Sequence, residues 1–379
     1  MIKINSQRLL SVSDYYYRKI HSTICARFSA ASMGINPFTG NSVQAWFVNR
    51  KTGKLNKGFL KILLTGTFDE IIAANPEIEY YLLTCKFLHY SSEQVDAKLP
   101  GKKKADRIAI RRAHVHKYRN PWLNKHSNAP GHRSFFSSNK NYNQFVRDVR
   151  TDMDILNDFI AQMIDYSNIS SELRHELLHL IGVEGCPYCN RQYITNYIDR
   201  RAKKATADLD HFYPNSVFKL FSLSLHNFVP SCQICNSRFK LAKGTEILYP
   251  YEYGFDQDTY FDVALTSSSN SDSLIGGNTY FNIKLHQTHT GHRADHLEGS
   301  IRLFQLQEVY QSHKEYVREL LHKQYVYKDA YNKDLTALFD NMQLSEQEIQ
   351  LFLYGHVLHE DKLSDRPLSK LAYDIITRR

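Results

Sequence analysis

Apolar residues return at helical spacing over most of this chain. Between Tyr142 and Tyr166 they recur every three or four positions, and this spacing predicts a long amphipathic helix. The same pattern runs from Glu77 to Tyr90 and from Ser171 to Ile181, where Gly182 is typical of a helix end. We therefore expect residues 1 to about 100, and the stretch up to Gly182, to be mainly helical.

Local signals mark further helices. Thr67 with Glu70, and Ser345 with Glu348, have the spacing of capping boxes ahead of apolar runs. The chain closes on one more predicted helix, Leu368 to Arg379.

Residues 183 to 255 have a different character, with short β-like runs, paired cysteines and proline and asparagine punctuation. Residues 279 to 286 alternate like a strand, and helical spacing returns after about residue 298. The pattern predicts a small mixed module over residues 183–255, held between a helical region over 1–182 and a mainly helical region over 256–379.

The composition is that of a folded, soluble protein. Of 379 residues, 42% are hydrophobic and 23% charged, and 25 tyrosines and 21 phenylalanines supply ample material for a core. No stretch approaches the roughly 18–20 apolar residues of a membrane span, and the start lacks the apolar run of a signal peptide. The cytoplasm is the compartment that we expect.

The net charge of +9 is concentrated in one segment. Residues 101–133 hold ten Lys and Arg against one acid, which leaves 38 basic and 38 acidic residues elsewhere. Such a segment attracts polyanions, although a solvated loop is the alternative interpretation. The candidate nucleic-acid contacts in it are Lys102, Lys103, Lys104, Arg111 and Arg112.

Four of the six cysteines form two CxxC pairs, Cys186 with Cys189 and Cys232 with Cys235. Two such pairs can complete a tetrahedral four-thiolate shell around zinc. Disulfides are the alternative, which a reducing compartment disfavours. A shell made only of protein ligands has no open position, so we expect structural rather than catalytic zinc.

A second set of residues lies between those pairs, namely Asp210, His211, Asn227 and Asn236. Phosphodiester hydrolysis requires a base, and a neutral imidazole is suited to that near pH 7. It also requires a hard cation, for which carboxylate and amide oxygens are suitable ligands, and a hydrogen bond that aims the base. Taken singly these residues mean little, but the order Asp-His, Asn, CxxC-Asn between two cysteine pairs is a compound pattern.

With these motifs, residues 183–245 resemble the HNH (ββα-metal) endonucleases. The segments LDHFYP, LHNFVPSC and CNSRFK look most like the PtuB-like HNH nucleases of bacterial antiphage defence systems. The resemblance implies a small ββα-metal module. With the helical pattern and the cysteine pairs described above, we expect an α+β fold, predominantly helical, with this module and its four-cysteine zinc staple embedded in the helical frame. The resemblance further implies cleavage of DNA, with RNA such as tRNA left open, and a partner ATPase.

The resemblance also assigns roles within the module. Asp210 and His211 would end the first strand of a hairpin, Asn227 would enter the second, and Asn236 would lie on the first turn of the helix. His211 would be the general base, Asp210 and Asn236 would hold Mg²⁺ or Mn²⁺, and Asn227 would brace the loop that carries His211. The family often has histidine where this chain has Asn236, which leaves the preferred metal open.

Three cations follow Asn236, namely Arg238, Lys240 and Lys243. They are placed to contact flanking phosphates, or else form a solvated helix face. No Gly-rich phosphate loop occurs in the sequence, so any dependence on ATP would come from another chain.

Two competing functions have sequence signals of their own. His175, Glu176 and His179 fit the HExxH motif of zinc proteases, but the apolar face of that predicted helix and the lack of a third ligand motif favour ordinary packing. A zinc module that binds nucleic acid without cutting it would use the basic segment and its aromatic residues; these are Tyr118, Trp122, Phe135 and Phe136.

A second histidine-rich stretch contains His286, His289, His292 and His296, with Asp295. It could form a metal site, but we expect a polar loop.

Overall fold

The computed structural model describes residues 1–126, 136–199, 202–288, 292–327, 339 and 342–378. Its α-helices are α1 (Gln7–Ala30), α2 (Lys57–Thr65), α3 (Phe68–Ala74), α4 (Glu77–Gln94), α5 (Lys104–Lys117), α6 (Pro121–His126), α8 (Asn139–Ala161), α9 (Ser171–Ile181), α10 (His292–Leu303), α11 (Leu306–Val309), α12 (Lys314–Val326), α14 (Glu346–Tyr354) and α15 (Ser369–Thr377). The strands are β1 (Asn196–Asp199), β2 (Ala202–Ala205), β3 (Ala207–His211), β4 (Phe228–Cys232), β5 (Thr259–Leu265) and β6 (Phe281–Gln287). Short 3-10 turns are η1 (Val43–Trp46), η2 (Asp96–Lys98), η3 (Tyr166–Asn168), η4 (Lys219–Phe221), η5 (Leu225–Asn227), η7 (Ser268–Ile275), η8 (Tyr310–His313) and η9 (Glu360–Lys362), and η6 (Cys235–Lys240) is a turn of π-helix.

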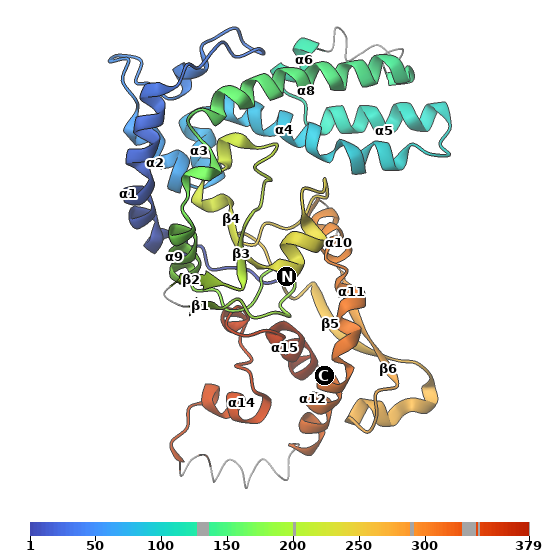
Figure 1. The fold of residues 1–379 in the computed structure, drawn as a ribbon. Coiled ribbons are helices and arrows are strands. Elements are labelled where there is room, and N and C mark those ends of the chain that lie inside the picture. Colours follow the sequence, from blue (N-terminus) through green and yellow to red (C-terminus); the bar gives the residue numbers. More distant parts are fainter. Residues whose placement is uncertain (127–135, 200–201, 289–291, 328–338, 340–341, 379) are drawn as a thin grey trace.

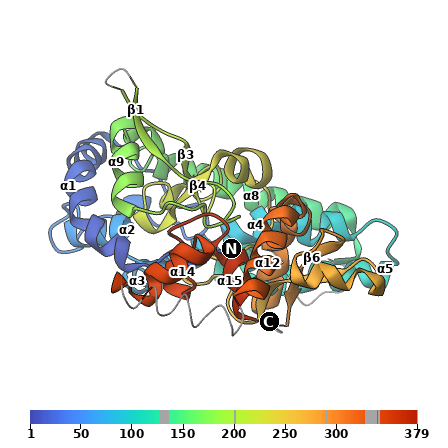
Figure 2. The same ribbon diagram turned by 90° about the horizontal axis from the view of Figure 1, so that it is seen from below.

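The helices surround a small central hairpin (Figures 1 and 2). The strands pair as three antiparallel hairpins, β1–β2, β3–β4 and β5–β6. Helix α1 packs on α9 beside the central β3–β4 hairpin, and α4 packs on α5 and α8 to form a helical arm. Helices α12 and α15 pack together, and α15 also contacts β5. This mostly helical arrangement with small antiparallel sheets confirms the predicted α+β class. Among the described residues, no helix is both long and apolar enough to cross a membrane.

The local signals in the sequence correspond to observed elements. Helix α9 covers the predicted residues and ends at Gly182, whose φ of 63° is left-handed. Both predicted capping boxes are present, at the starts of α3 and α14. The long helix predicted to Tyr166 ends earlier, at Ala161, because the chain turns at Asp165, whose side chain caps η3.

One contiguous hydrophobic core includes residues from the segments 1–182, 183–255 and 256–379. The first residues of the chain contribute to this continuity, because the amides of Ile2 and Ile4 each donate a 2.8 Å hydrogen bond, to the carbonyls of Pro187 and Pro250 respectively. Segments that precede the central hairpin in the sequence and segments that follow it therefore belong to the same core.

Glu246 connects the helical arm to the chain that follows η6. Its carboxylate accepts hydrogen bonds of 2.7 Å from both the Tyr118 hydroxyl and the Gln94 amide, and it pairs with Lys117 at the end of α5. Burial opposes ionisation of Glu246, but the bonds from Lys117 and Tyr118 outweigh it and lower the pKa of the carboxyl. The position of the arm is thus fixed by a mostly buried carboxylate close to the central hairpin.

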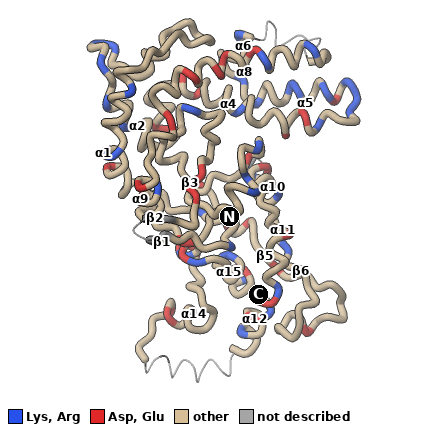
Figure 3. Tube along the Cα trace, viewed as in Figure 1, with Lys and Arg blue, Asp and Glu red and all other residues tan. Residues whose placement is uncertain are grey.

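The described part of the basic segment covers the turn before α5, α5 itself and α6 (Figure 3). Lys102, Lys103, Lys104 and Arg112 are exposed there and can face a polyanion. Arg111 cannot, and its prediction as a nucleic-acid contact is wrong. Only 2% of Arg111 is exposed, because its guanidinium donates to the Phe136 carbonyl and the Asn139 side chain and lies over the Tyr142 ring; it is a core cation of the arm.

Burial lowers the pKa of several histidines to about 4, among them His89, His114, His226 and His356. Between pH 6.5 and about 4 the unfolded chain binds protons at these rings that the folded chain does not. Stability therefore falls as the pH falls through this window.

His226→Gln should remove one of the rings that take up a proton when the chain unfolds in this pH window. Denaturant titrations between pH 7 and 4.5 should give a pH slope of the unfolding free energy smaller by up to about 1.4 kcal/mol per pH unit than in the natural chain. His179→Gln, the same substitution at an exposed histidine, supplies the control. An equal slope in the His226 variant would contradict the prediction.

Candidate metal and catalytic site

The four paired cysteines meet at the end of the central hairpin. Their sulfur atoms all lie within 4.8 Å of one another, all four residues are buried, and all are free thiols. Tetrahedral zinc with Zn–S bonds of about 2.3 Å requires sulfurs about 3.8 Å apart, and the sulfurs of Cys189 and Cys232, at 4.0 Å, are near that spacing. Backbone amides also point at the sulfurs: those of Cys232 and Arg191 donate at 3.4 Å to Cys186 and Cys189. Such bonds stabilise thiolates as ligands. The four-cysteine group can therefore hold a metal ion such as zinc.

The predicted order of strand, strand and helical turn is present between the cysteines. In the β3–β4 register His211 is opposite Phe228 and Ala207 is opposite Cys232. His211 is the last residue of β3, Asn227 directly precedes β4, and Asn236 is the second residue of η6. The cysteine group thus holds the end of β4 and the start of η6 against each other.

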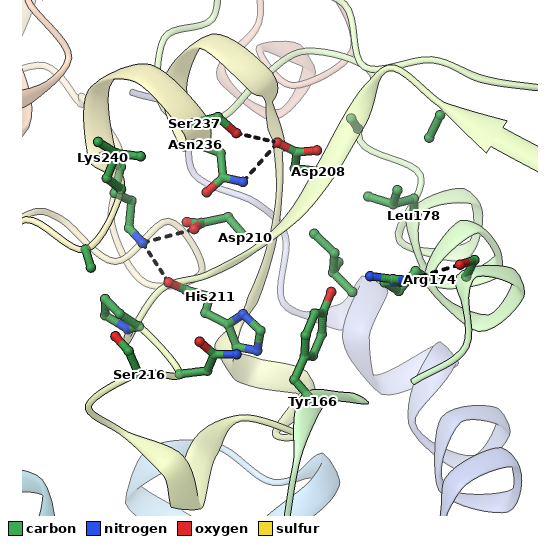
Figure 4. Close-up of a pocket in the computed structure, with 18 of the residues that line it drawn as sticks. Tyr166, Arg174, Leu178, Asp208, Asp210, His211, Ser216, Asn236, Ser237 and Lys240 are labelled. Atoms are coloured by element: carbon green, nitrogen blue, oxygen red, sulfur yellow. Dashed lines mark hydrogen bonds and ion pairs between the residues drawn. The ribbon is translucent and has the colours of Figure 1, made fainter. Parts of the chain in front are cut away.

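Asp210 is buried at 5% exposure and has two partners. Figure 4 shows one of them, Lys240. Its Oδ1 is 3.0 Å from the ammonium of Lys240, and its Oδ2 accepts a 2.6 Å hydrogen bond from the Tyr188 hydroxyl. Burial raises the pKa of the Asp210 carboxyl, while Lys240 and Tyr188 oppose that rise. The ammonium also donates to the carbonyl of His211 at 2.6 Å, so η6 is joined to β3 by a buried ion pair.

The prediction that Lys240 contacts flanking phosphates from the surface is therefore corrected. Its side chain is only 5% exposed, because the register of η6 against β3 turns it inward to Asp210. Arg238 and Lys243, in contrast, are exposed. Of these three neighbouring cations, one is therefore buried and two are exposed, a difference that sequence spacing alone does not reveal.

His211 is half-buried and oriented by a backbone bond. Its Nε2 lies 2.9 Å from the carbonyl oxygen of Ser222, and its ring packs edge-on against Tyr166 with centroids 4.4 Å apart. A carbonyl can only accept, so Nε2 carries the proton and Nδ1 keeps a lone pair. Burial lowers the pKa of His211 to about 4, so the ring is neutral near pH 7.

Asn227 is fully buried beneath the loop that joins the two strands. Its Oδ1 accepts a 2.8 Å bond from the Tyr213 amide, and its Nδ2 donates at 3.0 Å to the carbonyls of Tyr213 and Phe221. The side chain therefore fixes the loop that directly follows His211.

Asp208 is a site residue that the sequence analysis missed. Its Oδ2 accepts hydrogen bonds from the Asn236 amide at 2.9 Å and from the Ser237 hydroxyl at 3.3 Å (Figure 4). Because a carboxylate can only accept, this bond directs Nδ2 of Asn236 to Asp208 and leaves the amide oxygen free for another partner. Strand alternation could have revealed Asp208, since it lies two residues before Asp210 and shares its face of β3.

These side chains line a pocket of about 720 Å³. One wall carries Asp208, Asp210, His211, Asn236 and Lys240, and the other carries residues of α9 and Tyr166. The structure thus brings three of the four predicted catalytic residues to one pocket, while Asn227 lies beneath its loop. Among the described residues, no second group of three or more His, Cys, Asp or Glu ligands clusters as the cysteines do, so a cation here would be bound by few protein oxygens.

The HExxH residues do not form a second metal group within the described chain. Glu176 accepts a hydrogen bond from the Tyr15 hydroxyl, and His179 is exposed. Glu176 and His179 of the motif thus have different surroundings on α9. This agrees with the expectation of ordinary helix packing.

The second histidine-rich stretch is not the polar loop that we expected. His286 lies on β6, where it stacks on Tyr260 with centroids 5.2 Å apart, and α10 begins at His292. His296 also lies in α10, while His289 lies outside the described residues.

Comparisons of the chain with family models, with curated proteins and with solved structures found no match. The function therefore has to be inferred from the chemistry of the site itself.

Cys232→Ser should remove one ligand of the four-cysteine group and lower the stability of the whole chain. Because metal binding contributes folding free energy, we expect the bound zinc to be lost and the melting temperature to fall by about 10 °C or more. Metal analysis and thermal unfolding measure both effects. Cys25→Ser, at a half-buried thiol outside the group, should keep its zinc. A Cys232 variant with full zinc content would contradict a four-thiolate site.

Proposed function

We propose that this protein is a metal-dependent endonuclease of the HNH kind, which hydrolyses phosphodiester bonds of DNA. The observation that carries the proposal is one pocket wall on which a neutral, backbone-oriented His211 lies beside Asp210 and Asn236. The four-cysteine group, with zinc as its ion, would act as the structural staple of this wall.

His211 would be the general base. With Nε2 bonded to Ser222, Nδ1 is free to take a proton from a water molecule in the pocket. The water oxygen then bonds to phosphorus, the bond from phosphorus to the 3′ oxygen breaks, and the electron pair leaves with that oxygen, which is protonated by solvent. The lowered pKa keeps the ring in its basic form over the neutral pH range.

Asp210 and Asn236 would hold a divalent cation. Two of the roughly four acceptor positions of the Asp210 carboxylate are used by Lys240 and Tyr188, so positions remain for a metal. A site with one or two carboxylates, an amide and several waters suits Mg²⁺ or Mn²⁺. Such an ion supplies Lewis acidity toward a phosphate oxygen and the leaving oxygen. Asp208 would act as a positioning residue, because it turns the amide oxygen of Asn236 away from itself.

The proposed partners are the nucleic-acid substrate and a separate ATPase. Exposed cations at the start of α5, together with Arg238 and Lys243, would contact phosphates that flank the cleaved bond. Regulation by a separate ATPase within an antiphage defence system follows from the resemblance to PtuB-like nucleases and from the lack of a phosphate loop in this sequence.

A zinc module that binds nucleic acid without cleaving it is less well supported. The aromatic residues that would stack on bases are in the core, with Tyr118, Trp122 and Phe136 at most 3% exposed, and Phe135 lies outside the described residues. Binding alone also gives no reason for a histidine oriented beside a carboxylate and an amide.

His211→Ala should abolish cleavage while the protein stays folded. With supercoiled plasmid or total tRNA and Mg²⁺ or Mn²⁺, we expect the rate to fall by about 10³-fold or more, because the base is lost. His179→Ala is the matched control: this exposed histidine belongs to the HExxH sequence, and its loss should leave cleavage unchanged. Full activity of a folded His211 variant would end the assignment.

Asn236→Ala should weaken the catalytic cation without affecting the zinc. The Mg²⁺ concentration for half-maximal cleavage should rise by at least about 10-fold, and Asp208→Ala should shift it in the same direction by a smaller factor. Ser237→Ala removes only the longer 3.3 Å bond to Asp208 and serves as the control. An unchanged Mg²⁺ dependence in the Asn236 variant would exclude this residue as a ligand.

A further inference from the structure

The wall of the pocket opposite the carboxylates is built by α9. Arg174, His175 and Leu178 of this helix line the same pocket as His211 and Asn236. In Figure 4 the Arg174 side chain lies beside Tyr166, across the pocket from Asp208 and Asn236. His175 and Leu178 belong to the HExxH pattern of this helix, and Arg174 directly precedes that pattern.

Among the described residues, Arg174 is held in place by uncharged groups. Its guanidinium donates to the Ser171 hydroxyl at 3.0 Å and lies 5.6 Å from the centre of the Tyr166 ring, and neither partner is a carboxylate. Tyr166 in turn packs against the ring of His211. Since a guanidinium has five N–H donors, most remain for a ligand in the pocket. This arginine therefore differs from Lys240, whose charge is matched by Asp210.

The charges that line the pocket indicate a role for the guanidinium of Arg174. Two carboxylates, Asp208 and Asp210, face the pocket, and Lys240 offsets only one of them. A phosphodiester anion entering beside these carboxylates would be repelled unless a further positive group met it. Arg174 is a half-buried cationic donor on the facing wall of the pocket. Its planar fork matches two phosphate oxygens.

We propose that Arg174 is a further catalytic residue, which binds the non-bridging oxygens of the phosphate being cleaved while His211 activates water from the other wall. The inference rests on the proposed nuclease function and deepens it. Arg174 takes no proton and forms no bond to phosphorus; it stabilises the negative charge that grows on those oxygens during attack.

Arg174→Ala should lower kcat by about 100-fold, with a smaller change in KM, since the interaction strengthens as charge develops. Arg174→Lys should recover part of kcat, because it retains the charge but not the fork. Arg18→Ala is the matched control: this exposed arginine on α1 does not line the pocket and has no part in the site, so its loss should leave kcat and KM near those of the natural chain. Equal kcat values for the Arg174 and Arg18 alanine variants would overturn the proposal.

Two further measurements separate a phosphate contact from a merely structural role. A substrate with sulfur at one non-bridging oxygen should slow the natural protein stereospecifically and add little to the defect of Arg174→Ala. In the His211→Ala background, Arg174→Ala should reduce the salt slope of DNA binding by about one unit. Thio effects of the same size in both proteins, or an unchanged slope, would count against the contact.

The outcomes also separate this inference from the function on which it rests. If the natural protein cleaves neither plasmid nor tRNA with Mg²⁺ or Mn²⁺, the nuclease proposal fails. If the natural protein cleaves and folded Arg174→Ala cleaves equally well, only the role of Arg174 fails.

Discussion

The convergence of four thiols at the end of a two-stranded hairpin is the constraint on which the rest of the site depends. A five-residue strand pair is too short to be stable alone in water. The cysteine group joins the turn after α9 to the end of β4 and the start of η6. That closure sets the position of η6 from which Asn236 and Lys240 reach β3.

The same closure also anchors distant parts of the chain. Asn190 follows Cys189 directly. Its side chain accepts a 3.0 Å hydrogen bond from the backbone amide of Lys370 and donates one of 3.1 Å to the carbonyl of Leu363. The Tyr310 hydroxyl donates to the carbonyl of Cys189 at 2.7 Å. This turn is thus buried under the C-terminal helices, so disruption of the four-cysteine group would disturb far more than the hairpin.

Within the pocket, the two cations Lys240 and Arg174 have different partners. The ammonium of Lys240 pairs with Asp210 and donates to the backbone carbonyl of His211, and these contacts stiffen the packing of η6 on β3. Arg174, on the facing helix, is oriented by neutral groups and retains its charge for a ligand. One cation therefore has a structural role and the other faces the pocket, although both would look alike in a count of basic residues.

The sequence by itself determined the local elements and the residue types of the site. Capping boxes, the Gly182 stop and the paired cysteines act over a few residues, so their signals are readable in the chain. Which cations are buried was decided only by tertiary structure, because exposure depends on how helices pack: Arg111 and Lys240 are core groups. Asp208 and Arg174 became visible only when β3, η6 and α9 closed around one pocket, since that proximity arises from contacts between residues far apart in sequence.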